Sequence, residues 1–349
     1  MRKINTTYNK ENEIVKRKFF EQLEHSRDGK DPKTVTQYVN AIHEFEIVTD
    51  FNDFKMFNSD WVIDFKNHLS DKVNARTKEP ISKSHYFHYL SHVREFFEWL
   101  VANDRAYSKI KRRDIEYFHV TRNDKNKARA TGYQESYPLA DILATIRNMP
   151  CNTEMALRNR AMVSLCLLTT PRISALQTAR IQSVKYFKQY DAWAFVQDPR
   201  LLNTKFSKKI TAFFIGDVHE LIGYVIDWRE YLLAKKFTEK DYLFPKVASS
   251  FNSDCMPVVT LTKELIKSQS TIRDIFKQAF LANNIPYYKP HSFRHTIARA
   301  MKKQPNAVEL SIALAENMGH KGNLSTLHAS YGGDYEQQQS AILKAFELE

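Results

Sequence analysis

Residues 291–301, HSFRHTIARAM, place two histidines four positions apart with an arginine between them. On a helix His291 and His295 would face the same way, which is a spacing that zinc sites use. Arg294 would share that face, and its permanent positive charge would repel a bound cation. Ser292 also replaces the glutamate of the HExxH zinc motif. We therefore expect no metal here. We interpret His291 and Arg294 as groups that bind an anion, and we expect a structural role for His295.

Three other places could complete a site for a phosphate. Arg172 in LLTTPRISAL follows an apolar helix, and Lys205 in NTKFSKK lies at a turn between two strands. His320 in MGH and Tyr331 in ASYGG come close together near the end of the sequence. Arginine and lysine suit phosphate oxygens, and histidine can donate a hydrogen bond or move a proton near neutral pH. Taken singly, each is more often a surface charge or a packing residue, so the hypothesis rests on their order.

The composition favours a polyanionic partner. The chain has 349 residues, a net charge of +12 and a sequence pI of about 9.3, and 43% of its residues are hydrophobic. This length allows two domains with separate cores, and the basic balance favours nucleic acid or a membrane surface over other partners. An ordinary basic protein with a solvated surface is the alternative on charge alone.

Targeting and redox signals are missing. The first residues, MRKINTTYNKENE, contain no apolar segment, and the run AMVSLCLLTTP at 161–171 is too short to span a bilayer. Cys151, Cys166 and Cys255 are scattered and fit no CxxC pattern, which argues against disulfides and cysteine-bound zinc. We expect a cytoplasmic protein that does not bind membranes.

The first third predicts helices with apolar stripes. Asp31 and Pro32 are a plausible N-cap and first residue of a helix. Two further helices are expected in SDWVIDFKNHL and SKSHYFHYLSHVREFFEWL. The stripes are formed by Val35, Tyr38, Val39, Ile42 and Phe45, by Trp61, Val62, Phe65 and Leu69, and by Tyr86, Tyr89, Leu90, Val93, Phe96, Phe97 and Leu100. We interpret these stripes as the core of a small helical domain.

A basic segment without a sustained period follows at 109–129. We place the domain boundaries at 1–120 and 137–349, with residues 121–136 as an exposed linker. Such a segment is either solvated or contacts DNA phosphates. The candidate contacts are Lys111, Arg112, Arg113, Arg122, Lys125, Lys127 and Arg129, together with Lys321 beside His320.

The second domain is predicted to be mostly helical with a small antiparallel sheet. Strands are expected in VKYFKQYDAWAFVQD and KKITAFFI, which are rich in aromatic and β-branched residues. From about residue 217 we expect helices again, ending with a helix from Gln337. The fold class is therefore mainly α with a small antiparallel β-sheet (α+β).

The short motifs around Arg172, Lys205, His291, His320 and Tyr331, taken in this order, resemble those of the tyrosine recombinases. This family includes the phage-type integrases. Arg172 resembles the first arginine of the family's T-G-x-R-x-x-E-L box, and Lys205 resembles its β-hairpin lysine. HSFRH resembles the H-x-x-R box, MGH the third box and ASYGG the nucleophile region. The resemblance covers roughly residues 14–345, and it implies a helical core-binding domain and a catalytic domain that form a C-shaped clamp on DNA.

The resemblance implies a reaction. Tyr331 would attack a DNA phosphate to give a 3′-phosphotyrosine and a free 5′-hydroxyl, and a second 5′-hydroxyl would reverse the step through a Holliday junction. Arg172, Arg294 and His320 would stabilise the phosphate oxygens, Lys205 would protonate the leaving oxygen, and His291 would accept the tyrosine proton. The reaction needs neither metal nor ATP, so we expect no cofactor.

Two positions depart from the family pattern. Ala175 stands where the family usually has an acidic residue, which puts the local organisation in doubt but leaves the chemistry intact. The spacing from His320 to Tyr331 is longer than usual, so Tyr335 is a rival nucleophile. We prefer Tyr331 because ASYGG has the family's local pattern, whereas Tyr335 lies in GDYEQQQ, which leads into a helix.

The expected function is site-specific recombination, with integration or excision of a mobile element in a prokaryotic, nucleoid-associated setting. The expected partners are double-stranded DNA, three further copies in a tetrameric synapse, and DNA-bending accessory proteins. A topoisomerase of type IB and a catalytically inactive DNA-binding regulator are the alternatives.

Overall fold

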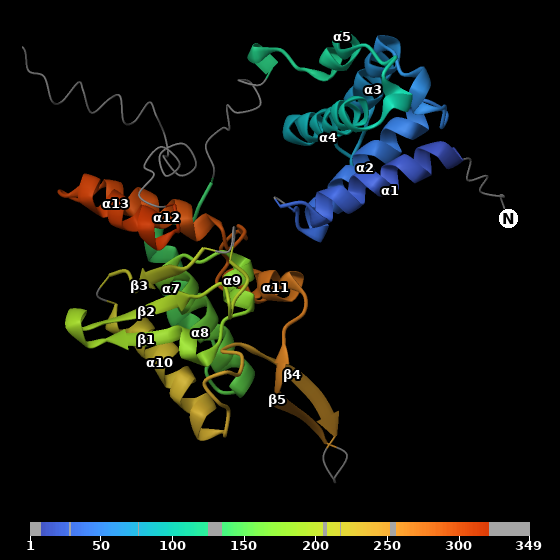
Figure 1. The fold of residues 1–349 in the computed structure, drawn as a ribbon. Helices are drawn as coiled ribbons and strands as arrows, with labels where there is room; N and C mark the ends of the chain where they lie inside the picture. Colours follow the sequence, from blue (N-terminus) through green and yellow to red (C-terminus); the bar gives the residue numbers. More distant parts are fainter. Residues whose placement is uncertain are drawn as a thin grey trace, which may run out of the picture. The chain divides into compact units, whose positions relative to one another are not determined.

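The structure, a computed structural model, describes residues 8–27, 29–75, 77–124, 135–204, 208–216, 218–251 and 256–320. The chain divides into two compact units, Met1–Thr131 and Gly132–Glu349, and each has its own hydrophobic core. The division falls inside the segment 121–136 that we predicted as a linker. Helices dominate and both sheets are small and antiparallel, so the predicted fold class is confirmed (Figure 1).

The first unit is a bundle of helices. Its α-helices are α1 (Lys10–His25), α2 (Pro32–Val48), α3 (Ser59–Asp71), α4 (Lys83–Asn103) and α5 (Arg112–Ile115). Short 3₁₀ turns lie at Phe54–Met56, Arg105–Tyr107 and Glu116–Phe118. The predicted N-cap at Asp31 is confirmed, since its carboxylate accepts hydrogen bonds from the backbone N–H groups of Lys33 and Thr34 at 2.9 and 3.1 Å.

Aromatic rings fill the core of this unit. Phe45 of α2 lies edge-on to Phe97 of α4, with ring centroids 5.4 Å apart, and Phe54 lies edge-on to Phe96 at 5.2 Å. All four rings are fully buried, as the apolar stripes predicted for Phe45, Phe96 and Phe97. Val39 is the exception, because 39% of it is exposed on the outer side of α2. The predicted stripe was one residue too wide there.

A polar network is buried beside these rings. The Lys16 ammonium lies 2.6 Å from the Glu46 carboxylate, and no part of Glu46 is exposed. The Asn12 amide donates to the carbonyl of Asn52 and accepts from the backbone N–H of Phe54. Burial raises the pKa of Glu46, against the opposing effect of Lys16. The network ties α1 to α2 and to the turn after it.

The basic segment after α4 belongs partly to this unit. Ile110, Ile115 and Phe118 are buried in its core, while Lys111, Arg112 and Arg113 are exposed. The helical turns of this segment are too short to give a recognisable hydrophobic periodicity in the sequence. Their apolar side chains anchor the segment in the core, and its charged side chains face solvent.

The second unit surrounds one central helix. Its helices are α7 (Leu139–Asn148), α8 (Glu154–Thr169), α9 (Ile173–Gln177), α10 (His219–Ala234), α11 (Gln269–Leu281), α12 (Ser292–Lys302) and α13 (Ala307–Asn317). Residues 161–170 are all buried, so α8 presents no polar face over its second half. A helix that is apolar all round lies in the middle of a core.

A three-stranded antiparallel sheet has the order β1 (Val184–Phe187), β2 (Ala192–Gln197), β3 (Ile210–Phe213). The predicted strand region around residue 190 is divided into β1 and β2 by a 3₁₀ turn, which ends at Asp191 with a positive φ of 48°. Residue pairs such as Phe195 with Ala212 set the register between β2 and β3.

A second hairpin was not predicted. β4 (Pro245–Phe251) pairs with β5 (Pro257–Leu265), in a region where we expected helices. Val259 is 49% exposed, and the described side chains of β5 show no strict alternation of buried and exposed positions. The expectation that the chain contains only helices from about residue 217 was wrong for this segment.

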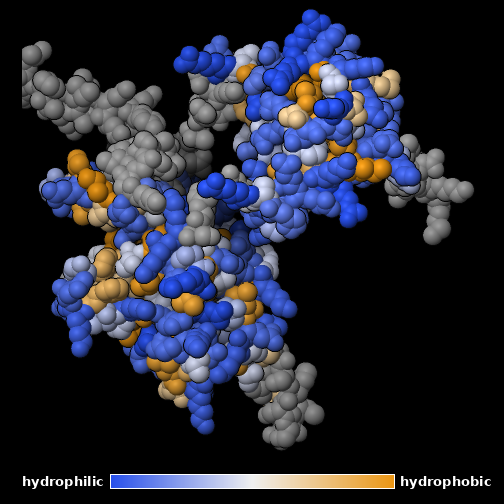
Figure 2. All heavy atoms as spheres, in the orientation of Figure 1, coloured by the Kyte–Doolittle hydropathy of each residue, from blue (hydrophilic) through white to orange (hydrophobic). Residues whose placement is uncertain are grey.

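The surfaces of both units are mainly polar. Figure 2 shows mostly hydrophilic side chains on the visible face, with separate hydrophobic patches between them. Among the described residues, no helix has both the length and the apolar character needed to cross a membrane.

Candidate active site

The end of α8 shapes one wall of the site. Thr170 caps α8 in the left-handed region, with a φ of 43°, and Pro171 then turns the chain into α9. The backbone N–H of Ile215, just after β3, donates to the carbonyl of Leu168 at 2.8 Å. This sharp turn makes Arg172 the N-cap residue just before α9, where its side chain is only partly buried.

Arg294 joins α12 to this turn. Its Nε donates to the carbonyl of Thr170 at 2.8 Å, and its Nη2 lies 3.4 Å from the carbonyl of Met318. Only 2% of Arg294 is exposed. One guanidinium therefore links the ends of α8 and α13, because its planar fork can donate in two directions.

The position of His320 is set by β3. The side-chain amide of Asn317 accepts from and donates to the backbone of Phe213, at 3.2 and 3.0 Å. Gly319 has a φ of 74°, and an added Cβ there would lie 2.4 Å from Cδ1 of Ile210. The backbone N–H of His320 then donates to the carbonyl of Ala315 at 2.8 Å. Only glycine allows the chain to turn this close to β3, which fixes where His320 begins.

Charged residues of these segments act on the ring of His291. Protein atoms packed around its ring lower the pKa of His291 to about 4, although part of the residue stays exposed. The charge of Arg294 lowers the pKa further, and His295, Arg172 and His320 act in the same direction. The structure thus brings together four predicted residues from three distant segments: Arg172, His291, Arg294 and His320. A cluster of this kind attracts an anion such as phosphate.

His295 lies against the same cluster. Its ring contacts that of His291 edge-on, with centroids 5.8 Å apart, and only 8% of the residue is exposed. Burial, followed by the charges of Arg299 and Arg294, lowers the pKa of His295 to about 4. A neutral, buried ring that packs against His291 agrees with the structural role we expected.

Ala175 is buried in α9, with 1% exposed. Its backbone N–H donates to the carbonyl of Arg172 at 2.9 Å, so the first turn of α9 forms without an acidic side chain. The departure from the family pattern therefore leaves the local backbone in place.

Several predicted residues lie outside the described residues. They are the nucleophile candidates Tyr331 and Tyr335, the lysines Lys205 and Lys321, the linker residues Lys125, Lys127 and Arg129, and the helix from Gln337. Arg122 is described and exposed, like the three basic residues from 111 to 113. Within the described residues, no group of three or more His, Cys, Asp or Glu side chains is placed to hold a metal ion.

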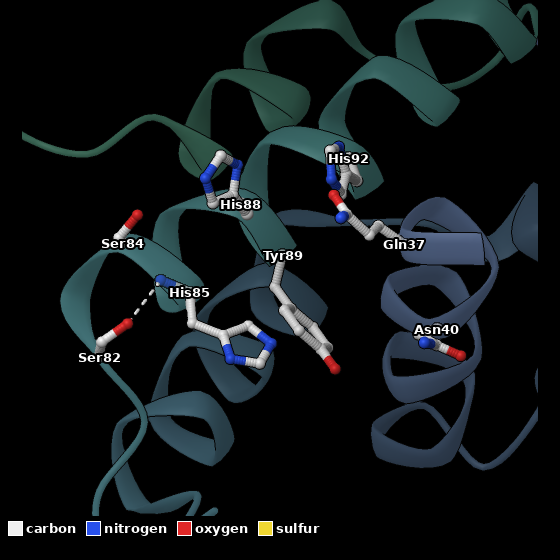
Figure 3. Close-up of a pocket in the computed structure, with 8 residues that line it drawn as sticks. All are labelled: Gln37, Asn40, Ser82, Ser84, His85, His88, Tyr89 and His92. Carbon is white, nitrogen blue, oxygen red and sulfur yellow. Dashed lines mark hydrogen bonds between the residues drawn. The ribbon is translucent and has the colours of Figure 1, made fainter. Parts of the chain in front are cut away.

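The sequence analysis missed one polar feature. A pocket between α2 and α4 is lined by His85, His88 and His92, to which we had assigned no role (Figure 3). Their spacing in SKSHYFHYLSHV places them along one helical stripe, and this was the available signal. It was hidden because the apolar stripe of the same segment was stronger.

Comparisons with known proteins identify a family and a fold. The family model described as "Phage integrase family" matches residues 139–335. A search of curated protein sequences finds no match.

Solved structures share the fold over most of the chain. The XerH site-specific recombinase bound to its difH substrate has a TM-score of 0.58 at 12% identity, with 88% of this chain and 78% of that chain covered. A lambda integrase dimer bound to a COC' core site gives 0.57 at 14%, covering 92% and 95%. The Tn1549 transposon integrase in complex with transposon right end DNA gives 0.58 at 13%, covering 95% and 99%.

At such low identities the solved structures show a common fold, whereas the family model matches the sequence itself. That match covers more than half of the 349 residues, and it includes Arg172, His291, Arg294 and His320. The chain belongs to the phage integrase family, the tyrosine recombinases.

Proposed function

We propose that this protein is a site-specific DNA recombinase that cuts and rejoins DNA through a phosphotyrosine. The observation that carries the proposal is that the charges of Arg172, Arg294 and His320 all act on His291, and these four residues come from three separate segments. Family membership and the likeness to DNA-bound recombinases support it. The net charge of +12 suits a polyanionic partner.

The proposed reaction begins when the Tyr331 oxygen attacks a DNA phosphorus atom. The new P–O bond forms as the bond to the 5′-oxygen breaks, and Lys205 donates a proton to that oxygen. His291 accepts the proton of the tyrosine. With a pKa of about 4 in the free protein, His291 is neutral at pH 7 and can accept a proton, and a neighbouring phosphate would raise this pKa towards neutrality.

Arg172, Arg294 and His320 would stabilise the charge that develops on the non-bridging oxygens. Because Arg294 is buried and held by two carbonyl groups, it needs little reorganisation during the reaction. Removing one preorganised donor typically costs about 100- to 1,000-fold in rate. The arginines would supply the positive charge that a metal brings elsewhere.

Rejoining would reverse the first step. A 5′-hydroxyl from a second DNA site attacks the phosphotyrosine, Tyr331 leaves, and the phosphodiester bond of DNA is restored without ATP.

We propose that four copies bring two sites together and that the reaction passes through a Holliday junction. We further propose that the basic residues Lys111, Arg112, Arg113 and Arg122 contact phosphates, together with Lys125, Lys127, Arg129 and Lys321. Integration or excision of a mobile element in a prokaryotic cytoplasm, assisted by DNA-bending proteins, is the corresponding biological role.

A nicked suicide substrate tests the chemistry. The nick lets the short fragment that carries the new 5′-hydroxyl diffuse away, so a covalent protein–DNA adduct accumulates and can be detected on denaturing gels. We expect an adduct with the wild-type chain and none with Tyr331→Phe. Recombinant products or Holliday junctions from two sites would exclude a relaxing topoisomerase. An absence of adduct with the protein's own site would instead indicate an inactive DNA-binding protein.

A further inference from the structure

The short helix α9 carries Arg172 at its N-terminal end and is held mainly at its other end. It has only five residues, Ile173–Gln177, and a helix of this length is not stable without tertiary contacts. No side chain caps its N-terminus, and Ala175 offers only a methyl group where the family usually has an acidic side chain. Gln177 and the C-cap residue Thr178 instead supply hydrogen bonds to two other segments.

Gln177 ties α9 to the connection between β5 and α11. Its side-chain nitrogen donates to the carbonyl groups of Ile266 and Lys267, at 2.7 and 2.9 Å, and only 8% of the residue is exposed. The two carbonyl groups take both N–H groups of the amide. The connection is short, because β5 ends at Leu265 and α11 begins at Gln269, and α11 packs against α9 (Figure 1). The amide therefore fixes α9 to its neighbouring helix.

Thr178 ties the same end of α9 to a second segment. Its hydroxyl donates to the carbonyl of Ser174 at 2.9 Å and accepts from the backbone N–H of Asn203 at 2.9 Å. Asn203 lies between β2 and β3, directly after Leu202, which is buried in the core. One hydroxyl can make both bonds at once, because it has one donor and two lone pairs. The C-terminal end of α9 is thus held from two directions.

The distance from these contacts to Arg172 is short. Five helical residues span about 7.5 Å, so a tilt of α9 at its C-terminal end also moves the residue that precedes its first turn. A displacement of about 1 Å at a reacting group can cost about 100-fold in rate. The Gln177 amide has both N–H groups engaged, so its effect on the site would pass through the helix and not through a contact with DNA.

We propose that Gln177, assisted by Thr178, is a positioning residue for Arg172 and provides, from the far end of α9, the organisation that Ala175 cannot provide. The inference rests on the proposed function, because the direction of Arg172 matters only if its guanidinium stabilises charge on a phosphate. It adds two residues to the proposed machinery that neither touch the reacting atoms nor belong to a motif.

The test is single-turnover trapping with two nicked substrates, one with an ordinary phosphate and one with a methylphosphonate at the cleavage position. A methyl group in place of one non-bridging oxygen removes the negative charge that Arg172 would stabilise, so a misplaced Arg172 no longer slows the reaction. Gln177→Met keeps the length of the side chain and removes its donors. We expect it to form the phosphate adduct about 10- to 100-fold more slowly than wild type, and the methylphosphonate adduct within about 3-fold of wild type. Arg172→Ala should show the same pattern with a larger loss.

Three further variants separate the hydrogen bonds from shape and stability. Gln177→Glu has almost the same shape but points an acceptor at two carbonyl groups, so it should behave like Gln177→Met. Thr178→Val should also slow the phosphate substrate selectively, and Thr178→Ser, which keeps the hydroxyl, should restore the wild-type rate. The two Thr178 variants carry the comparison if Gln177→Met does not fold.

Arg158→Met is the matched control. The buried Arg158 of α8 donates to the carbonyl of Pro245 at 2.7 Å, and so holds the β4 end of the hairpin without touching α9. Its loss should lower stability and leave the ratio of the two trapping rates at the wild-type value.

Four results would overturn the inference. They are equal slowing of both substrates by Gln177→Met, a wild-type rate for Gln177→Glu, failure of Thr178→Ser to restore the rate, and a changed ratio in Arg158→Met. In each case the wild-type chain still traps DNA, so the positioning role is refuted and the proposed chemistry stands. A wild-type chain that traps neither substrate refutes the proposed function, and the inference fails with it.

Discussion

The guanidinium of Arg294 donates a hydrogen bond to the carbonyl of Thr170, 124 positions earlier in the chain, at 2.8 Å. The contact is buried, and it lies where α8 ends in a left-handed turn just before Arg172. One residue thus supports the fold and the proposed phosphate site together. Because of this double role, replacing Arg294 should affect both the stability of the fold and the proposed activity.

Replacing Arg294 by lysine should impair both properties. Lysine keeps the charge, but it cannot donate to the carbonyl groups of Thr170 and Met318 in the same planar geometry. We expect the free energy of unfolding to fall by about 1–3 kcal/mol, because a buried carbonyl loses its partner. Adduct formation should slow about 100-fold. Chemical denaturation and the trapping assay measure the two effects.

The control for this change is Arg17→Lys. Arg17 lies on the surface of α1, where it pairs with Glu21. Neither stability nor adduct formation should change measurably there. Wild-type rates for Arg294→Lys would show that charge alone matters at this position.

Gly319→Ala should distort the segment that leads to His320. The backbone has a φ of 74° there, and the new Cβ would lie 2.4 Å from Cδ1 of Ile210. We expect a loss of about 1–3 kcal/mol in stability and slower cleavage. Adding Ile210→Val removes the clashing methyl group and should restore part of the loss, while the backbone strain remains.

Gly223→Ala is the matched control for the glycine. Gly223 lies within α10, and nothing lies within 4 Å of an added Cβ. Alanine favours a helix interior, so this variant should gain about 0.5–1 kcal/mol. Equal effects of the two substitutions on unfolding would contradict the close approach of Gly319 to β3.

Stability should fall in acid as buried histidines take up protons. The pKa of His92 is about 4 in the folded chain and about 6.5 when unfolded, so the unfolded state binds the proton first. Its contribution is complete above pH 6.5 and is lost as the pH falls towards 4. The slope is at most about 1.4 kcal/mol per pH unit for this group. Denaturation of His92→Phe at several pH values should show a correspondingly flatter decline, and a slope equal to that of the wild type would contradict the assignment.

Breaking the ion pair between Lys16 and Glu46 should destabilise the first unit. Glu46→Gln removes the buried carboxylate that pairs with Lys16 and leaves Lys16 with its other partner, the half-exposed carboxylate of Glu13, so we expect a cost of about 1–3 kcal/mol. Glu21→Gln, which removes an exposed carboxylate, should change the unfolding free energy by less than about 0.5 kcal/mol. Similar values for the two variants would show that the buried pair is compensated elsewhere.

The helices of the first unit could be predicted because each buries one face and exposes the other. Phe45 and Phe97 are examples, since their helical spacing alone identified them as core. The β4–β5 hairpin could not be predicted in the same way, because it projects partly exposed side chains and has an irregularity between Pro245 and Val247. Its pattern therefore lacks the alternation that a buried face imposes.

The residues of the site could be predicted from the order of their motifs along the sequence, but the geometry of the site could not. No local signal reveals that Gly319 lies against Ile210, or that Arg294 reaches the carbonyl of Thr170. Both contacts depend on how β3, α8 and α13 pack. The pocket between α2 and α4 was missed for a related reason, because His92 becomes unusual only once its burial is known.

The most direct test of the account is covalent trapping on a nicked substrate that carries the protein's own site. Wild type and Tyr335→Phe should both yield the adduct, and Tyr331→Phe should yield none. Peptide mapping of the adduct should place the DNA on Tyr331. An adduct that persists in Tyr331→Phe and disappears in Tyr335→Phe would contradict the nucleophile assignment, and no adduct with any variant would contradict the proposed recombinase activity itself.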